Sequence, residues 1–354
     1  MWCLRRGRFR PEFALVFFFL ISAILASTLS CTKLESVLRL KVPPVSQSAK
    51  PKKSLVFRSK DYIVCRLEKR ESASDLAARF LGDPEKSWVI EEANKGVPLT
   101  PHNWVVIPLR DEKKGGVKPE GYQVVPILCY HEFAQNCQSS LCTPVSLFKK
   151  HMHYLKENGY RVIPMKQLLE FLQYRRAIPP KAVVITIDDG YRSAFTTAFP
   201  ILKKQGFPAT LFLYTDFIAS SANALTWEQV RTMKRAGFEI GSHTLSHCNL
   251  TAKRKGENEQ AYVERIKREL MLSKKVLDEK LDQNTIYLAF PYGHYNPRVV
   301  SLCEKAGYKM CFSVGKGGNP FFADPLTLGR SQVLQKDMKS FVSMLKTFQA
   351  FSQR

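Results

Sequence analysis

The chain has 354 residues and a formal net charge of +23 at pH 7, with 54 Lys and Arg against 31 Asp and Glu. This length allows one large domain and one small module, and a hydrophobic content of 45% excludes a wholly disordered chain. The charge favours contact with anionic surfaces, although a solvated basic surface is the simpler interpretation. No zinc-finger or RNA-binding aromatic motif accompanies it, so we expect no nucleic-acid partner.

The N-terminus has the pattern of an export signal. Four arginines between positions 5 and 10 precede an uncharged apolar run, residues 13–29. Such a pattern directs export, and the run is also just long enough for an uncleaved membrane anchor. The small residues that end at Cys31 resemble a bacterial lipoprotein processing site, which makes Cys31 the candidate lipidation site. We therefore expect residues 1–31 to be a signal peptide or lipoprotein signal, and the protein to lie in the cell envelope, membrane-anchored, periplasmic or extracellular.

Two stretches follow that differ in composition. Residues 32–60 carry eight Lys or Arg, one Glu and three Pro without a long apolar period, which predicts a flexible basic linker. Residues 61–110 predict the order strand, helix, helix, strand, with Ser72 or Ser74 as the first helix cap.

This βααβ order resembles a LysM module. The matching stretches are Tyr62-Ile63-Val64, Ser74-Asp75-Leu76-Ala77, Trp88 to Asn94, and Val106-Ile107-Pro108. The resemblance implies that the module binds glycans that contain N-acetylglucosamine. The alternative is a small structural domain without a ligand.

Residues 121–335 alternate apolar runs with amphipathic helices. Nearly continuous apolar strands separated by helices predict a parallel sheet or a β/α barrel. We expect a further helix over residues 336–354. The expected strands are residues 124–129, 161–163, 182–187, 209–213, 238–240, 287–290 and 310–312.

The nine cysteines include one pair in a single polar loop, Cys137 and Cys142. In an oxidising compartment this pair is the expected disulfide. No Cys-x-x-Cys pair is present, so the sequence does not predict a cysteine-based zinc site.

Two carboxylates end the apolar strand 182–187, at Asp188-Asp189-Gly190. Neighbouring carboxylates repel each other unless a cation binds one and leaves the other as a base. Taken alone, the motif is equally typical of a turn with a helix cap.

Two histidines, His243 and His247, follow the strand 238–240 with a spacing of four residues. This spacing suits two imidazoles on one metal ion. Two histidines and one carboxylate leave open positions for water and substrate, which favours a catalytic metal site over a structural one. A third strand ends at Pro291-Tyr292-Gly293, where the Tyr292 N–H is a candidate donor to a developing oxyanion.

Together the three segments resemble the polysaccharide deacetylase family with the NodB-type domain, carbohydrate esterase family 4. The resemblance implies a distorted β/α barrel that removes acetyl groups with the help of a divalent metal, usually zinc. Carried onto this sequence, it makes Asp188 the catalytic base and Asp189, His243 and His247 the metal ligands. Tyr292, together with Pro291, would contact the substrate.

The chain departs from the family pattern at two points. An arginine that usually orients the base is replaced by Ala289, and Arg330 is the candidate substitute. The usual C-terminal histidine is absent, since no histidine follows His294. The early Tyr130-His131 pair resembles a rearranged subgroup that includes poly-N-acetylglucosamine deacetylases, in which this histidine is the general acid. A core histidine is the alternative for His131.

We therefore expect a monomeric hydrolase that removes N-acetyl groups from N-acetylglucosamine-containing polysaccharide. Trp227 is a candidate for stacking on a sugar ring, with burial as the alternative. Two other functions remain open: an O-acetyl esterase with the same site, and a glycan-binding wall protein without activity. Free amine or free hydroxyl in the product distinguishes the two reactions.

Overall fold

The computed structural model describes residues 56–110, 114–334 and 337–351. The export signal, Cys31 and most of the linker expected over residues 32–60 lie outside these described residues. Within them, no helix combines the length and apolar character that crossing a membrane requires.

The N-terminal module has the predicted order of strand, helix, helix and strand, with one strand added. Strand β1 pairs antiparallel with β2 at residues that we expected to belong to the linker, because its Val56-Phe57-Arg58 segment extends the sheet. The two helices pack on the sheet through a core that includes Ile63, Leu76, Ile90 and Ile107. The elements are β1 (Val56–Arg58), β2 (Tyr62–Arg66), α1 (Ala73–Leu81), η1 (Pro84–Lys86), α2 (Ser87–Ala93) and β3 (Trp104–Pro108).

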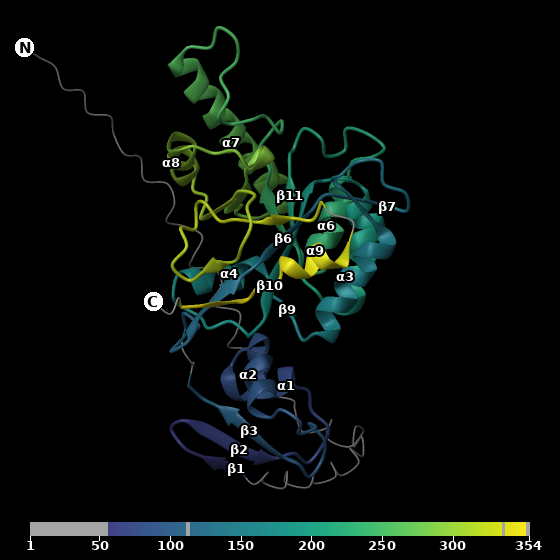
Figure 1. The fold of residues 1–354 in the computed structure, drawn as a ribbon, viewed down its shortest axis with the longest axis vertical. Coiled ribbons are helices and arrows are strands. Elements are labelled where there is room, and N and C mark those ends of the chain that lie inside the picture. The colour runs from purple at the N-terminus through teal and green to yellow at the C-terminus, as the bar shows by residue number, and fades with distance from the viewer. Residues whose placement is uncertain (1–55, 111–113, 335–336, 352–354) are drawn as a thin grey trace, which may run out of the picture. The chain divides into compact units, whose positions relative to one another are not determined.

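The larger domain is built on a curled parallel sheet (Figure 1). Its strands follow the order β14-β13-β12-β11-β10-β6-β16, and β9 (Arg161–Val162) also pairs with β10. The segment before β16 hydrogen-bonds to β14 and the loop after it, through Ser313 N to Leu328 O and Gly315 N to Arg330 O, and so closes the barrel. The strands are β6 (Ile127–Tyr130), β10 (Ala182–Asp189), β11 (Thr210–Leu213), β12 (Glu239–Ser242), β13 (Tyr287–Ala289), β14 (Met310–Phe312) and β16 (Ser331–Gln332).

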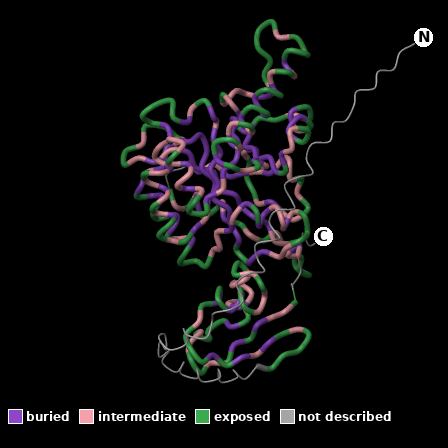
Figure 2. The backbone as a smooth tube through the Cα atoms, turned by 180° about the vertical axis from the view of Figure 1, so that it is seen from behind, coloured by how far each residue is buried: buried purple, intermediate pink, exposed green. Residues whose placement is uncertain are grey.

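Helices surround this sheet, and the buried backbone lies at its centre (Figure 2). Side chains of alternate residues along β10 enter different cores. Val183, Ile185 and Ile187 pack against the outer helices, whereas Ala182 and Val184 face the barrel interior. The helices are α3 (Val145–Glu157), α4 (Met165–Leu172), η2 (Ala194–Ala198), α5 (Phe199–Gln205), α6 (Trp227–Arg235), α7 (Glu259–Leu281), α8 (Pro297–Lys305) and α9 (Met338–Ser343).

The C-terminal segment differs from the prediction of a single helix over residues 336–354. Helix α9 ends at Ser343, and Phe348–Ala350 then forms β17, which pairs antiparallel with β5 (Gly121–Val125). The backbone of β5 offers unpaired hydrogen-bonding groups to this segment, and tertiary pairing overrides the helical pattern. Strand β5 is itself separated from β6 by Pro126, which divides the run predicted over residues 124–129.

Smaller elements complete the domain. The disulfide predicted between Cys137 and Cys142 is present, next to the two-stranded pair of β7 and β8. The remaining elements are β4 (Val117–Lys118), β7 (Glu132–Ala134), β8 (Cys142–Pro144), η3 (Pro291–Gly293) and β15 (Asn319–Pro320).

Candidate metal centre and its neighbours

Asp188 and Asp189 reach the same end of the barrel because the backbone changes direction between them. Asp188 continues the alternation of β10 into the barrel interior and is 1% exposed. Asp189 has a φ of +73°, a left-handed conformation that is uncommon outside glycine. This conformation turns the second carboxylate back to the strand end, where a regular strand would send it to the opposite face.

The two histidines come from the segment that follows β12. His243 leaves the strand end, and the chain then passes through Thr244 at φ +71° and His247 at φ +58°. The Nδ1 atom of His243 lies 2.8 Å from the carbonyl oxygen of Ala289. Donation of that hydrogen bond leaves the Nε2 lone pair free to bind a metal ion.

Asp189, His243 and His247 form a compact set of potential ligands. Asp189 Oδ1 lies 3.5 Å from His243 Nε2 and 3.4 Å from His247 Nε2. The three ligand atoms all lie within 4.8 Å of one another. Asp189 Oδ1 is buried and has no hydrogen-bond partner, and a buried carboxylate oxygen without a partner is costly. A divalent cation between these three atoms removes that cost, so the residues fit such an ion.

The protonation states agree with a metal site. Burial, together with the negative charge of Asp188, raises the pKa of Asp189 to about 7. Burial lowers the pKa of His243 to about 3 and also lowers the pKa of His247. Both imidazoles are therefore neutral at pH 7, which is the form that binds metal, and a cation would stabilise the ionised form of Asp189.

Arg330 holds the other carboxylate. Its Nη1 and Nη2 atoms donate to Asp188 Oδ1 and Oδ2, each at 2.7 Å. Both side chains are almost completely buried. Burial alone would raise the pKa of Asp188, but the charge and the hydrogen bonds of Arg330 outweigh it, and the pKa is lowered. Arg330 was the candidate substitute for the arginine absent at position 289, and its guanidinium group does contact Asp188.

His131 lies beside Asp188 and not in the outer core. The ligand atoms of Cys129, His131 and Asp188 lie within 4.8 Å of one another. Burial lowers the pKa of His131, and the charge of Asp188 opposes this effect. His294, which follows the Pro291–Gly293 turn and is the other histidine considered for the acid role, belongs to neither cluster; it is exposed and contacts Asn249. The structure therefore places His131, of the two, next to the candidate base.

The predicted substrate contacts have different surroundings. Tyr292 is 58% exposed, has a φ of +60° and places its ring 4.8 Å from that of His247. Pro291, the preceding residue, is buried. Trp227 is the first residue of α6 and packs against the outer core, which agrees with the alternative of burial. Its contact with substrate stays a prediction.

A buried glutamate on α7 supports the histidine segment. Glu269 Oε2 accepts hydrogen bonds from the backbone N–H groups of Leu245 and Ser246, at 3.1 and 3.0 Å. Its Oε1 accepts one from the Ser246 hydroxyl at 2.7 Å. These contacts hold the segment in a conformation that contains two strained φ angles.

The comparisons with known proteins agree with this geometry. Residues 175–311 match the family model described as polysaccharide deacetylase. YxkH of Bacillus subtilis, which is named for the same family, is 33% identical over 200 residues, or 56% of this chain and 68% of that protein. The chain belongs to the polysaccharide deacetylase family. The residues that match the family model lie within the larger domain, and the class of reaction is hydrolysis of an acetyl group from polysaccharide.

Other relatives carry more specific names. The poly-β-1,6-N-acetyl-D-glucosamine N-deacetylase of Escherichia coli K12 is 28% identical over 214 residues, which cover 51% of this chain and 32% of that protein. Among solved structures, the Streptococcus pyogenes deacetylase PplD, in complex with acetate, has a TM-score of 0.57 at 26% identity and covers 64% of this chain and 99% of that one. IcaB from Ammonifex degensii shares the fold, with a TM-score of 0.55 at 23% identity, covering 63% and 96%.

Proposed function

We propose that the protein removes N-acetyl groups from a polysaccharide that contains N-acetylglucosamine, with a divalent metal ion, most simply Zn²⁺, held by Asp189, His243 and His247. The observation that carries the proposal is the adjacency of two clusters at one barrel end. The potential metal ligands and the Asp188–His131 pair meet at the Asp188-Asp189 dipeptide. Relatives named as poly-β-1,6-N-acetyl-D-glucosamine N-deacetylases support the choice of substrate.

In the proposed reaction, the oxygen of a water molecule bonds to the acetamide carbon and the carbon–nitrogen bond breaks. A bound divalent cation would polarise the acetamide carbonyl and make water a better nucleophile. Asp188 accepts a proton from water, because Arg330 keeps its carboxylate ionised. His131 donates a proton to the leaving nitrogen, and acetate and a free amine result. The lowered pKa of His131 makes its protonated form a stronger acid.

The exposed side of the centre provides the remaining contacts. Tyr292 places its ring against His247 at the surface, where an aromatic ring can pack on the apolar face of a sugar. Its backbone N–H is the proposed donor to the oxyanion that forms during attack.

The export signal and the N-terminal module complete the proposal. We infer an envelope protein in which residues 61–110 bind the glycan as a LysM module does and the deacetylase domain acts on it. The βααβ order of the module supports this assignment. Cys31 or the apolar run 13–29 would attach the protein to a membrane.

The test is incubation of the zinc-loaded protein with β-1,6-linked N-acetylglucosamine oligomers, chitin oligomers and peptidoglycan. We expect release of acetate together with an equal amount of free amine from at least one of them. Acetate without free amine, from an O-acetylated glycan only, would replace the proposal by an O-acetyl esterase. Binding to the glycans without any acetate would leave a wall-binding protein without activity.

A further inference from the structure

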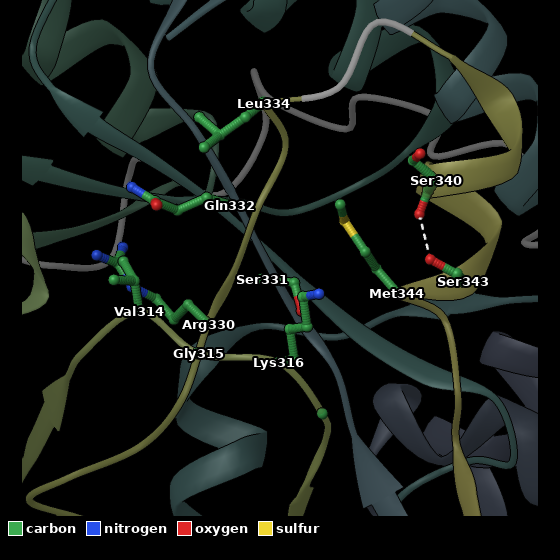
Figure 3. A pocket seen from close by; sticks show the side chains of 11 residues that line it. Val314, Gly315, Lys316, Arg330, Ser331, Gln332, Leu334, Ser340, Ser343 and Met344 are labelled. Atoms are coloured by element: carbon green, nitrogen blue, oxygen red, sulfur yellow. Dashed lines mark hydrogen bonds between the residues drawn. The ribbon is translucent and has the colours of Figure 1, made fainter. Parts of the chain in front are cut away.

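A pocket of about 470 Å³ lies beside β16, at the seam where the barrel closes (Figure 3). We name it the seam pocket. Its walls are residues 314–317 of the loop after β14, the strand β16 with its flanking residues, and α9. Its volume is within the range of small-molecule binding sites.

The seam pocket and the candidate centre share one wall. Arg330 belongs to that wall, and its guanidinium group binds Asp188. The backbone of Arg330 accepts a hydrogen bond from Gly315 N–H at 2.8 Å. Val314, which also lines the pocket, packs directly against Gly293 of the Pro291–Gly293 turn. A Cβ built on Gly293 would lie 2.4 Å from Val314 Cγ2. Val314 thus borders the turn that carries the exposed Tyr292, and a polymer whose reacting unit lies at the metal centre can extend across this turn to the loop 314–317.

The chemistry of the pocket suits a sugar. In Figure 3, Arg330 and Gln332 extend to one side of the strand, whereas Ser331 and Lys316 lie on the side that faces Met344 of α9. The Ser331 hydroxyl, the Lys316 ammonium group and the apolar Met344 side chain thus lie on one side of the strand, a mixture of polar and apolar groups that suits the polar edge and apolar face of a pyranose ring.

The charged residues that line the pocket are all basic. None of its eleven lining residues, all in the described part of the chain, is Asp or Glu. Two of them are cationic, but the Arg330 charge is paired with Asp188, so Lys316 supplies the charge that a ligand meets. A neutral or anionic group is compatible with this lining, whereas an ammonium group would meet a like charge and no carboxylate.

We propose that the seam pocket binds the sugar unit next to the one that reacts, and that Lys316 makes it select a neutral N-acetylated unit over a deacetylated one. The inference rests on the proposed function. The amine that deacetylation produces is a base and carries a positive charge when protonated. The protein would therefore react slowly beside a unit that it has already converted, and free amines would be scattered along the polysaccharide.

The experiment uses the full zinc-loaded chain and two defined β-1,6-linked pentamers of N-acetylglucosamine, one fully acetylated and one with a single free amine at a central unit. For the wild type, we expect kcat/KM to be roughly three- to tenfold lower on the second pentamer, the effect of one like charge a few ångströms away near a surface. Lys316→Glu should abolish or reverse this ratio, because it places a carboxylate where the ammonium binds. Lys316 is exposed, so the substitution does not disturb the core.

Two further variants complete the design. Lys305→Glu is the matched control. Lys305 is exposed near the end of α8, which leads into the start of β14 at the opposite end of the barrel. The ratio of kcat/KM between the two pentamers should stay as in the wild type. Gly315→Leu adds a side chain to the pocket lining at a position where a Cβ meets no atom within 4 Å. It should raise KM for the acetylated pentamer more than KM for a β-1,6-linked disaccharide, which is too short to reach the pocket from the metal centre. Acetate from no oligomer at all would reject the proposed function. Acetate release with the same pentamer ratio in wild type and Lys316→Glu would reject the inference alone.

Discussion

Arg330 binds both carboxylate oxygens of Asp188, although 142 positions separate the two residues in the sequence. The same guanidinium group also donates to Thr186 Oγ1 at 3.2 Å and, through Nε, to the Ser313 carbonyl at 3.3 Å. Four contacts fix the orientation of the group, and a bidentate pair of this kind adds geometric specificity as well as energy. The orientation and the ionisation of Asp188 therefore both depend on Arg330.

Arg330→Lys should shift the acid limb of the kcat/KM profile to higher pH. Lysine cannot reproduce the two parallel bonds, so the pKa of Asp188 should rise by about one to two units. The ionised carboxylate is the active form, and activity is lost as pH falls through its pKa; a higher pKa moves that loss to higher pH. The pH profile of acetate release measures the shift, with Arg268→Lys on the exposed side of α7 as the control. An unchanged acid limb would separate Arg330 from the ionisation of Asp188.

Glu269→Ala should weaken metal binding, although Glu269 is not one of the three proposed ligands. The carboxylate holds the segment between His243 and His247, and loss of such supporting contacts typically costs about 10–100-fold in metal affinity. Glu269→Gln keeps one acceptor oxygen and should lose less. Metal dissociation constants from competition with a chelator provide the readout, independent of activity. The control is Glu279→Ala, which is exposed on the same helix; equal affinities in the Glu269→Ala and Glu279→Ala variants would refute the role.

His131→Ala should retain metal while turnover falls by about 10²–10⁴-fold, the usual cost of removing a general acid. His294→Ala should turn over nearly as the wild type, because His294 is exposed and lies in neither cluster. The basic limb of the pH profile should also flatten in the His131 variant. The opposite ranking of the two variants would transfer the acid role to His294.

His151 should make the protein less stable in mild acid. The ring is fully buried, stacks on Phe341 and lies 3.1 Å from the Tyr130 hydroxyl, and burial lowers its pKa to about 4. Between pH 4 and 6.5 the unfolded state binds a proton that the folded state does not, so the free energy of unfolding falls as pH is lowered through this window. The full contribution, about 3 kcal/mol from a shift of this size, is present above pH 6.5.

Urea unfolding at several pH values tests this expectation with His151→Gln, whose side-chain oxygen can still accept from Tyr130. The variant should lose part of the slope of stability against pH between 4 and 6.5. If wild type and variant have parallel slopes, the titration of His151 is not the cause.

The strands and the cluster of candidate metal ligands could be predicted because their signals are local. The run 182–187 is apolar except for Thr186, and the Asp188-Asp189 and His243-x-x-x-His247 patterns each lie within a few residues. Arg330 was identified only as a candidate, because nothing near it in sequence shows that it faces Asp188. That contact arises from closure of the barrel, which brings β16 beside β6.

Other features could not be predicted because they depend on tertiary packing. Glu269 looks like any other charged residue of a long helix, and only the packing of α7 against the histidine segment buries it. Cys129 lies 3.4 Å from Asp188 Oδ2 for the same reason, since β6 and β10 are neighbours. Strand β17 was missed because its pattern favours a helix until the edge of β5 is available for pairing.

The most direct test of the central claim is acetate released from an N-acetylglucosamine oligomer by wild type and Asp188→Asn at equal, measured metal content. We predict about one divalent ion per chain in both proteins, because Asp188 is not among the three ligands, and loss of about 10²–10⁴-fold in turnover in the variant. His243→Ala should lose the ion as well as the activity. Normal turnover by metal-loaded Asp188→Asn, or a full complement of metal in a His243→Ala/His247→Ala double variant, would contradict the account.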